Sequence, residues 1–200
     1  MEQKTVKKNK LVYGIGRNDF ESSVNVKGVA IKSYQVWQDM LKRCYSDKYK
    51  DKNPTYKNCK VCEEWLSFST FNKWFEENYP KHLVDKVDRI ELDKDLLVEG
   101  NKVYSPETCV FLPKRINSFM TNKQSNNTSG RIGVCFHKST KKWLVNINDF
   151  EETKRKHIGL FSDLEEASEA YQVARAEQAE KAKAWLRELG YAENIVEKIR

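Results

Sequence analysis

The chain has 200 residues, of which 39% are hydrophobic and 12% aromatic, and its formal net charge is +7. This length allows one large domain or two to three small ones, and this composition excludes a wholly disordered chain. The longest apolar runs are only a few residues, which excludes a membrane-spanning helix. Because the first ten residues are charged and contain no apolar signal segment, we expect a cytoplasmic protein.

The charge is distributed in blocks along the chain. Residues 1–60 carry 14 Lys or Arg against 6 Asp or Glu, and residues 121–161 carry 8 against 3, whereas the segments 61–120 and 162–200 are net acidic. A basic surface attracts polyanions whatever their sequence. The pattern therefore favours a nucleic-acid partner, with a solvated lysine-rich surface as the alternative.

The first part of the chain reads as short strands followed by helical segments. Residues 11–28 alternate apolar residues with glycine turns, which predicts one or two short strands. Residues 33–46 place apolar side chains at helical spacing, and residues 61–78 carry an aromatic stripe at similar spacing. Such a stripe usually lies in a core, so we expect it to be buried rather than to bind a ligand.

Residues 87–113 read as two strands around a Gly100-Asn101 turn, and a short helix begins after Pro113. The polar stretch KQSNNTSG, residues 123–130, has the composition of a linker. We therefore predict two domains, residues 1–123 and residues 124–200.

The last part of the chain predicts a compact unit of three strands and a helix. Three runs of period two occupy residues 132–137, 143–148 and 156–161, and a long Ala-rich amphipathic helix capped by Asp163 follows them. A final short helix is expected over residues 192–200. The predicted fold class is α+β, ending in a three-stranded antiparallel sheet packed on one long helix.

Four segments in this last part, GRIGV, KKWLVNI, HIGLF and EEASEAY, resemble the Apetala/ethylene-response-factor type of DNA-binding domain over roughly residues 126–184. In that family a three-stranded sheet lies in the major groove of double-stranded DNA and the helix packs behind it. The resemblance and the strand alternation together imply DNA contacts by Arg131, His137, Lys141, Lys142, Asn146, Asn148, Arg155 and Lys156.

The chain departs from that family where bases are read. The family uses several arginines for this purpose, whereas Ile132, Cys135, Asn146 and Asn148 stand at some of those positions here. The departure puts recognition of GC-rich DNA in doubt, and the resemblance alone predicts no base preference.

The front part, over about residues 11–120, resembles phage-encoded HNH-type endonucleases, including homing enzymes. The resemblance is carried by YGIG, WQDMLKRCY, YKNCKVCEEWLSFSTFNKW and LDKDLLVEGNKVYSPETCVFLPKRIN. It implies an HNH-like ββα-metal domain with extra helices, which hydrolyses DNA phosphodiester bonds with one divalent ion such as Mg²⁺. A phage-encoded protein of this kind would act in the cytoplasm of the host cell.

Carried onto this sequence, the family pattern gives three predicted catalytic residues and metal ligands, Asp93, Asp95 and Asn117. Asp93 stands where the family has its catalytic histidine, and Thr108 stands where the family has a central Asn that pins the loop. Carboxylate and amide oxygens are ligands that Mg²⁺ accepts. Lys114 and Arg115 are expected to hold the scissile phosphate.

Three interpretations of this segment stay open. Asp93 could act as base or metal ligand in an active variant, the site could be retired in a DNA-binding regulator, or the carboxylates could decorate a solvated hairpin. Less strongly, the aromatic-rich front part could inhibit a host protein.

The five cysteines also allow two interpretations. An odd number of cysteines without a signal segment argues against a disulfide framework. Cys59 and Cys62 form a CxxC motif that could bind structural Zn²⁺ together with Cys44 and Cys109. The alternative, which we favour, is that these thiols fill small spaces in a core, because Cys44 and Cys62 fall on apolar positions.

Overall fold

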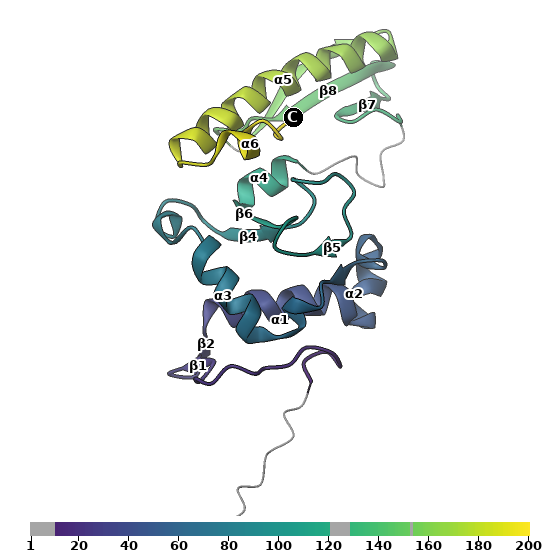
Figure 1. Cartoon of the computed structure of the whole chain (residues 1–200). Helices are drawn as coiled ribbons and strands as arrows, with labels where there is room; N and C mark the ends of the chain where they lie inside the picture. The colour runs from purple at the N-terminus through teal and green to yellow at the C-terminus, as the bar shows by residue number, and fades with distance from the viewer. Residues whose placement is uncertain (1–10, 121–128, 153) are drawn as a thin grey trace, which may run out of the picture. The chain divides into compact units, whose positions relative to one another are not determined.

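The computed structural model describes residues 11–120, 129–152 and 154–200. Helices and strands mix along the chain, which confirms the α+β class (Figure 1). The chain divides into two compact units, Met1–Leu112 and Pro113–Arg200. The domain boundary that the sequence predicts, near residue 124, lies outside the described residues.

Two packed helices form the centre of the first unit, α1 (Lys32–Tyr45) and α3 (Phe68–Asn78). Trp37 of α1 and Phe68 and Phe71 of α3 are completely buried, and the Trp37 indole donates a hydrogen bond of 2.7 Å to the carbonyl oxygen of Trp65. The expectation that the aromatic stripe lies in the core is confirmed. Shorter helical pieces are α2 (Asp47–Lys52), η1 (Pro54–Tyr56), η2 (Glu64–Leu66) and η3 (Lys81–Leu83).

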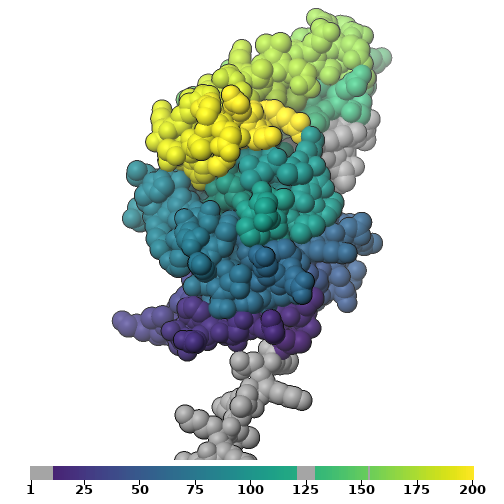
Figure 2. Space-filling model, in the orientation of Figure 1, coloured from purple at the N-terminus to yellow at the C-terminus, as the bar shows by residue number. Residues whose placement is uncertain are grey.

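A small hairpin precedes these helices, and only its first strand falls within residues 11–28, where the sequence predicts one or two short strands. Its strands β1 (Asn25–Val26) and β2 (Val29–Ala30) are antiparallel. Lys27 and Gly28 close it with φ values of 51° and 82°, the left-handed conformation that tight two-residue hairpin turns require. Figure 2 shows the hairpin, in purple, as a projection from the surface of the first unit.

The sequence predicts two strands on either side of the Gly100-Asn101 turn, and the structure shows that the strands next to this turn do not pair with each other. The structure has three strands here, and β4 (Ile90–Asp93) pairs with β6 (Val110–Pro113). The strand that follows the turn, β5 (Val103–Tyr104), instead pairs in parallel with β3 (Lys60–Val61). Gly100 does turn the chain, with φ +72°, but side-chain hydrogen bonds rather than a hairpin ladder hold the loop between β4 and β5.

The second unit contains the predicted three-stranded antiparallel sheet and long helix. Its strands lie in the order β7-β8-β9, and Figure 1 shows α5 running along the sheet. The short helix expected after Pro113 is also confirmed. The elements are α4 (Lys114–Phe119), β7 (Val134–His137), β8 (Lys142–Asn148), β9 (Arg155–Phe161), α5 (Leu164–Glu188) and α6 (Glu193–Val196).

One face of the sheet packs on α5. Val134, Val145 and Ile147 are buried there with Ala167, Tyr171 and Ala174 of the helix. Small alanine side chains allow the helix to approach the sheet closely, and alternate strand residues must then point to the opposite face. The helix begins as predicted, because one carboxylate oxygen of Asp163 accepts the N–H groups of Glu165 (2.8 Å) and Glu166 (3.0 Å).

The C-terminal segment, which contains α6, packs against α5. After α5 the chain turns at Gly190, which has φ +83°, and Val196 and Ile199 are buried. The yellow atoms of α6 and of the end of α5 form one continuous surface in Figure 2. None of the helices in the described part of the chain combines the length and the apolar character that crossing a membrane requires.

A buried glutamine joins α5 to the turn after β8. Gln178 is only 2% exposed, and its Oε1 accepts the N–H of Phe150 at 2.7 Å. We expect Gln178→Ala to lower the free energy of unfolding by about 1–3 kcal/mol, because that buried N–H would lose its acceptor. Urea unfolding measures the change. Gln172→Ala, at an exposed position of the same helix, is the matched control, and equal losses in the two variants would contradict the prediction.

Candidate functional site

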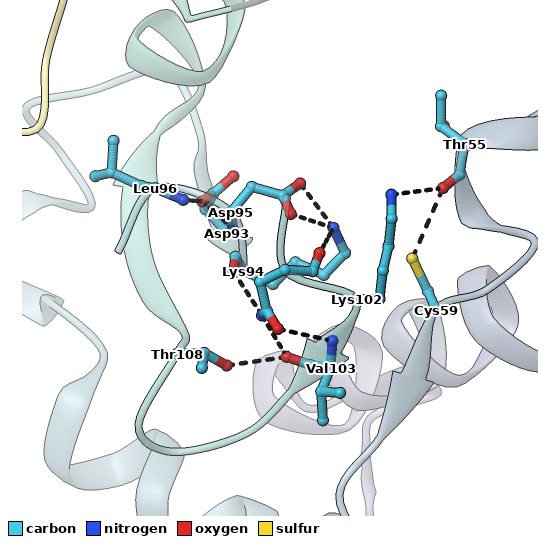
Figure 3. Close-up of polar contacts among 10 residues, drawn as sticks. Thr55, Cys59, Asp93, Lys94, Asp95, Leu96, Lys102, Val103 and Thr108 are labelled. Atoms are coloured by element: carbon cyan, nitrogen blue, oxygen red, sulfur yellow. Dashed lines mark hydrogen bonds and ion pairs between the residues drawn. The ribbon is translucent and has the colours of Figure 1, made fainter. Parts of the chain in front are cut away.

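The loop that follows β4 is organised by the carboxylate of Asp93. This residue ends the strand, and its Oδ1 accepts the N–H groups of Asp95 at 2.9 Å and Leu96 at 2.7 Å (Figure 3). Its Oδ2 accepts no hydrogen bond from the described residues. The carboxylate is therefore fixed at the start of the loop by one oxygen.

Burial raises the pKa of Asp93 above its usual value. The two backbone N–H groups and the Lys94 ammonium favour the charged form and offset part of this effect, while the charge of Asp95 adds to it. A carboxylate with a raised pKa is a stronger base than an ordinary aspartate. Perturbed groups of this kind are more frequent at functional sites than elsewhere, although ion-pair networks also produce them.

Lys94, which sequence reasoning did not consider, lies at the centre of the loop. Its side chain is buried, and Nζ donates to both carboxylate oxygens of Asp95 at 2.6 Å and to the carbonyl oxygen of Asn101 at 3.1 Å. The ammonium also lies 5.9 and 5.8 Å from the ring centres of Tyr56 and Tyr104. A buried lysine requires a compensating charge, so Asp95 has a structural partner whatever else it binds.

Asn101 closes the loop. Its Nδ2 donates to the carbonyl oxygens of Lys94 at 2.8 Å and Val103 at 2.6 Å, and its Oδ1 accepts the N–H of Val103 at 3.0 Å (Figure 3). Thr108 Oγ1 donates to the same Val103 carbonyl oxygen at 2.9 Å. Thr108, which stands where the HNH-type family has the Asn that pins the loop, therefore bonds the same carbonyl oxygen as Asn101. The sequence indicated Asn101 only as a turn residue.

Basic side chains border the loop on the side of η1. Lys102 Nζ donates to the carbonyl oxygen of Thr55 at 3.4 Å (Figure 3), and the Arg43 guanidinium forms a hydrogen bond with the Tyr104 hydroxyl. Lys48 and Lys52 of α2 are exposed. The same helix also exposes Asp47 and Asp51, so the cations shown to lie at this loop are Lys94 and Lys102.

The three predicted residues of α4 belong to the second unit. Lys114 is exposed and Asn117 is half-buried. The Arg115 guanidinium carbon lies 4.3 Å from the ring centre of Phe150 and 5.2 Å from that of Trp185. Its Nε and one Nη are buried without a hydrogen-bond partner among the described residues. That Asn117 joins the two aspartates around a metal ion, and that Lys114 and Arg115 hold a phosphate, stay predictions.

The cysteines lie mostly in the core of the first unit. Cys44, Cys59 and Cys109 are buried and Cys62 is half-buried, all as free thiols. Burial raises the pKa of Cys44 and of Cys109 to about 12, which disfavours the thiolate that binds zinc. Within the described ranges no group of three or more His, Cys, Asp or Glu side chains is arranged to hold a metal ion. Core packing is therefore the better-supported interpretation of the cysteines.

In the second unit, five of the residues predicted to contact DNA share the sheet face opposite α5. The strand register pairs His137 with Lys142 and Asn148 with Arg155, and Asn146 of β8 lies between these two pairs. Since Val145 and Ile147 point into the core, these alternate residues point away from it. The sheet thus presents His137, Lys142, Asn146, Asn148 and Arg155 together.

The other three predicted contacts lie off that face, and the prediction for Lys156 as a contact of the outer face is wrong because Lys156 shares the side of the sheet on which Ile147 packs against α5. Lys141 occupies the β7–β8 turn with φ +55°, and Lys156 is exposed on β9 opposite Ile147. Arg131 is exposed and forms an ion pair with Glu165 of α5. The sequence reasoning missed His157, which pairs with Asn146 on the outer face. The sequence does contain a signal for His157, because it lies two residues after Arg155 and alternate strand residues share a face.

A β-bulge sets the register at this point. Val145 pairs with Gly159 and Asn146 with His157, so Ile158 is an extra residue in β9. The extra residue reverses the alternation along the strand. As a result both Ile158 and Phe161 pack against the core, while Leu160 points outward opposite Leu144. Strict alternation read from the sequence would place Phe161 on the wrong face.

Comparisons of the chain with models of known protein families, with curated proteins and with solved structures find no significant match. The functional argument therefore rests on the residues and their geometry.

Proposed function

We propose that this protein binds double-stranded DNA through the outer face of the β7-β8-β9 sheet. The observation that carries the proposal is the chemistry of that sheet. None of the residues in these three strands is Asp or Glu, whereas the outer face carries the cations Lys142 and Arg155 and the amides Asn146 and Asn148. A surface with this balance suits a polyanion that also presents hydrogen-bonding groups.

The dimensions of a sheet fit the same partner. A ribbon of two or three strands enters the major groove, where an Asn side chain can pair with the edge of adenine. Lys141 lies in the β7–β8 turn, and Lys142 and Arg155 lie on the outer face near the ends of the strands, where they can contact phosphates on either side of the groove. The helix behind the sheet keeps these side chains in a fixed arrangement.

Binding of a short mixed-sequence duplex to the full chain, measured over a series of salt concentrations, tests this proposal. We expect the affinity to fall steeply with salt, and the Lys142→Gln and Arg155→Gln variants each to weaken binding by about tenfold and to reduce the salt slope by about 1. Lys198→Gln, which makes the same charge change at an exposed position outside the sheet, is the control. Equal effects of the sheet and control variants would contradict the proposed face.

A second candidate function is favoured by the raised pKa of Asp93, namely hydrolysis of DNA phosphodiester bonds as in HNH-type endonucleases. One oxygen of Asp93 accepts no hydrogen bond from the described residues, and burial raises the pKa of this carboxyl, which makes it a stronger base than an ordinary aspartate. If Asp93 serves instead as a metal ligand, Asp93 and Asp95 would hold a divalent ion such as Mg²⁺, which would lower the pKa of a bound water and neutralise phosphate charge. Asp95 would share its carboxylate with the Lys94 ammonium.

If the second candidate fails, the protein remains a DNA-binding regulator with an inactive nuclease-like loop. Variants can test the two functions separately, because the sheet belongs to the second unit and Asp93 to the first. DNA binding without cleavage would identify the regulator.

A further inference from the structure

The centre of the outer sheet face is apolar. The register places Cys135 of β7, Leu144 of β8 and Leu160 of β9 side by side across the three strands. Cys135 and Leu160 are exposed and Leu144 is half-buried. We call these three residues the apolar row. An apolar row at the centre of a polar face matches a partner that presents both kinds of surface.

Polar side chains border the apolar row on both sides. The His137 and Lys142 pair lies on one side, and the Asn146 and His157 pair lies on the other. The next pair, Asn148 and Arg155, continues the polar face. The order along the sheet is therefore cationic, apolar, amide, and then cationic again.

The bulge in β9 is the reason that the row exists. Because Ile158 is an extra residue, Leu160 rather than Gly159 or Phe161 faces outward opposite Leu144. A Cβ atom at Gly159 would lie 3.0 Å from the Phe161 ring, so the glycine allows Phe161 to turn into the core. The backbone of the strand thus brings a leucine to the centre of the outer face.

The four base pairs differ in what they present in the major groove. Thymine carries a C5 methyl group, which apolar side chains contact, and adenine offers a donor and an acceptor that match an Asn amide. Guanine offers two acceptors, which arginine matches best. Arg155 is the arginine on the outer face and lies at its edge, whereas the centre carries the apolar row and Asn146.

We propose that the outer face of this sheet selects A·T base pairs, with the apolar row against thymine methyl groups and Asn146 paired with adenine. This inference rests on the proposed function and gives it a base preference. The charge of the face supports a duplex as the occupant rather than a protein, because its strands carry cations and no carboxylate.

The experiment starts from a pool of duplexes with a randomised central segment, from which the full-length protein enriches its preferred sequence. We expect A·T pairs to be enriched at the centre. The enriched duplex is then remade with deoxyuridine in place of thymidine, which removes the methyl groups and keeps base pairing. Binding is expected to weaken about 4-fold for each contacted methyl group. A centre rich in G·C pairs, or equal binding of both duplexes, would overturn the inference.

Two further binding measurements distinguish recognition of the methyl group from recognition of the groove shape. A duplex with 5-methylcytosine in place of cytosine carries the methyl group on a G·C pair, and we expect it to bind more tightly than its unmethylated form. The Leu144→Ala/Leu160→Ala variant is expected to bind thymidine and deoxyuridine duplexes equally, whereas Val173→Ala, at an exposed apolar position on α5, keeps the wild-type difference. If the double variant keeps that difference, the row does not read the methyl groups.

The binding experiments distinguish a wrong base preference from a wrong proposal of DNA binding. Salt-sensitive binding of every duplex without enrichment of A·T pairs retains DNA binding and removes the base preference. Absence of binding to any duplex, with the protein shown to be folded by circular dichroism, removes both.

Discussion

Replacing Gly133 by alanine is expected to lower the free energy of unfolding of the second unit by about 2–5 kcal/mol. A Cβ atom at this position would lie 2.0 Å from Cε2 and 2.1 Å from Cδ2 of Tyr171, a core residue of α5. Overpacking of a core typically costs about 1–3 kcal/mol. Gly133 also has φ +72°, a left-handed conformation that costs a non-glycine residue about 1–2 kcal/mol.

Gly130→Ala separates these two contributions. Gly130 has φ +79°, but a Cβ atom there would meet no atom within 4 Å. The control variant should therefore show only the conformational part of the loss. Urea unfolding of both variants, followed by the fluorescence of the tryptophans, measures the difference. If the two variants are equally stable, the Tyr171 ring moves aside at little cost and the approach of the sheet to the helix is not tight.

The architecture of the second unit was predictable because its sequence carries complete local signals. Three runs of period two predict strands, and an Asp cap before an Ala-rich amphipathic segment predicts the helix. The structure confirms all four elements and the Asp163 cap. The bulge at Ile158 was not predictable, because a single extra residue changes no composition and little periodicity.

The first unit was predictable only in part. The helical spacing and the aromatic stripe predict α1, α3 and their core, since burial of large side chains leaves a periodic pattern. The pairing of β3 with β5 was missed because each strand has two residues, too few for a pattern. A parallel pair between segments far apart in the chain also leaves no local turn signal.

The candidate site shows the same limit. The sequence singles out Asp93 and Asp95 from their place in a motif, but it does not show that β4 ends at Asp93 and that Asp95 lies in the loop beyond it. Sequence reasoning also missed the buried Lys94, because lysine is rarely buried and nothing in the sequence marks this one. The partner of a carboxylate depends on tertiary packing, which composition does not reveal.

Asp93→Asn is expected to lower DNA cleavage in Mg²⁺ by about 10²–10⁴-fold, because it removes the proposed base while leaving the loop intact. An asparagine Oδ1 can still accept the N–H groups of Asp95 and Leu96. Nicking and linearisation of a supercoiled plasmid measure the activity. Asp88→Asn, a charge change at an exposed position shortly before β4, is the control and should cleave like the wild type. Undiminished cleavage by Asp93→Asn would remove this residue from the catalytic assignment.

The same variant should keep or increase its stability at neutral pH. Burial raises the pKa of Asp93 above the ordinary 3.8, so the folded state favours the protonated carboxyl, and that contribution is lost as pH rises through the raised pKa. Asparagine is neutral at every pH. The stability of the variant relative to the wild type should therefore increase from about pH 4 upward and become constant above the raised pKa. Urea unfolding of both proteins over this pH range measures the difference. If the variant instead loses stability relative to the wild type as pH rises, the fold favours the charged carboxylate. Asp93 would then be a structural residue of the loop and not a base for a substrate.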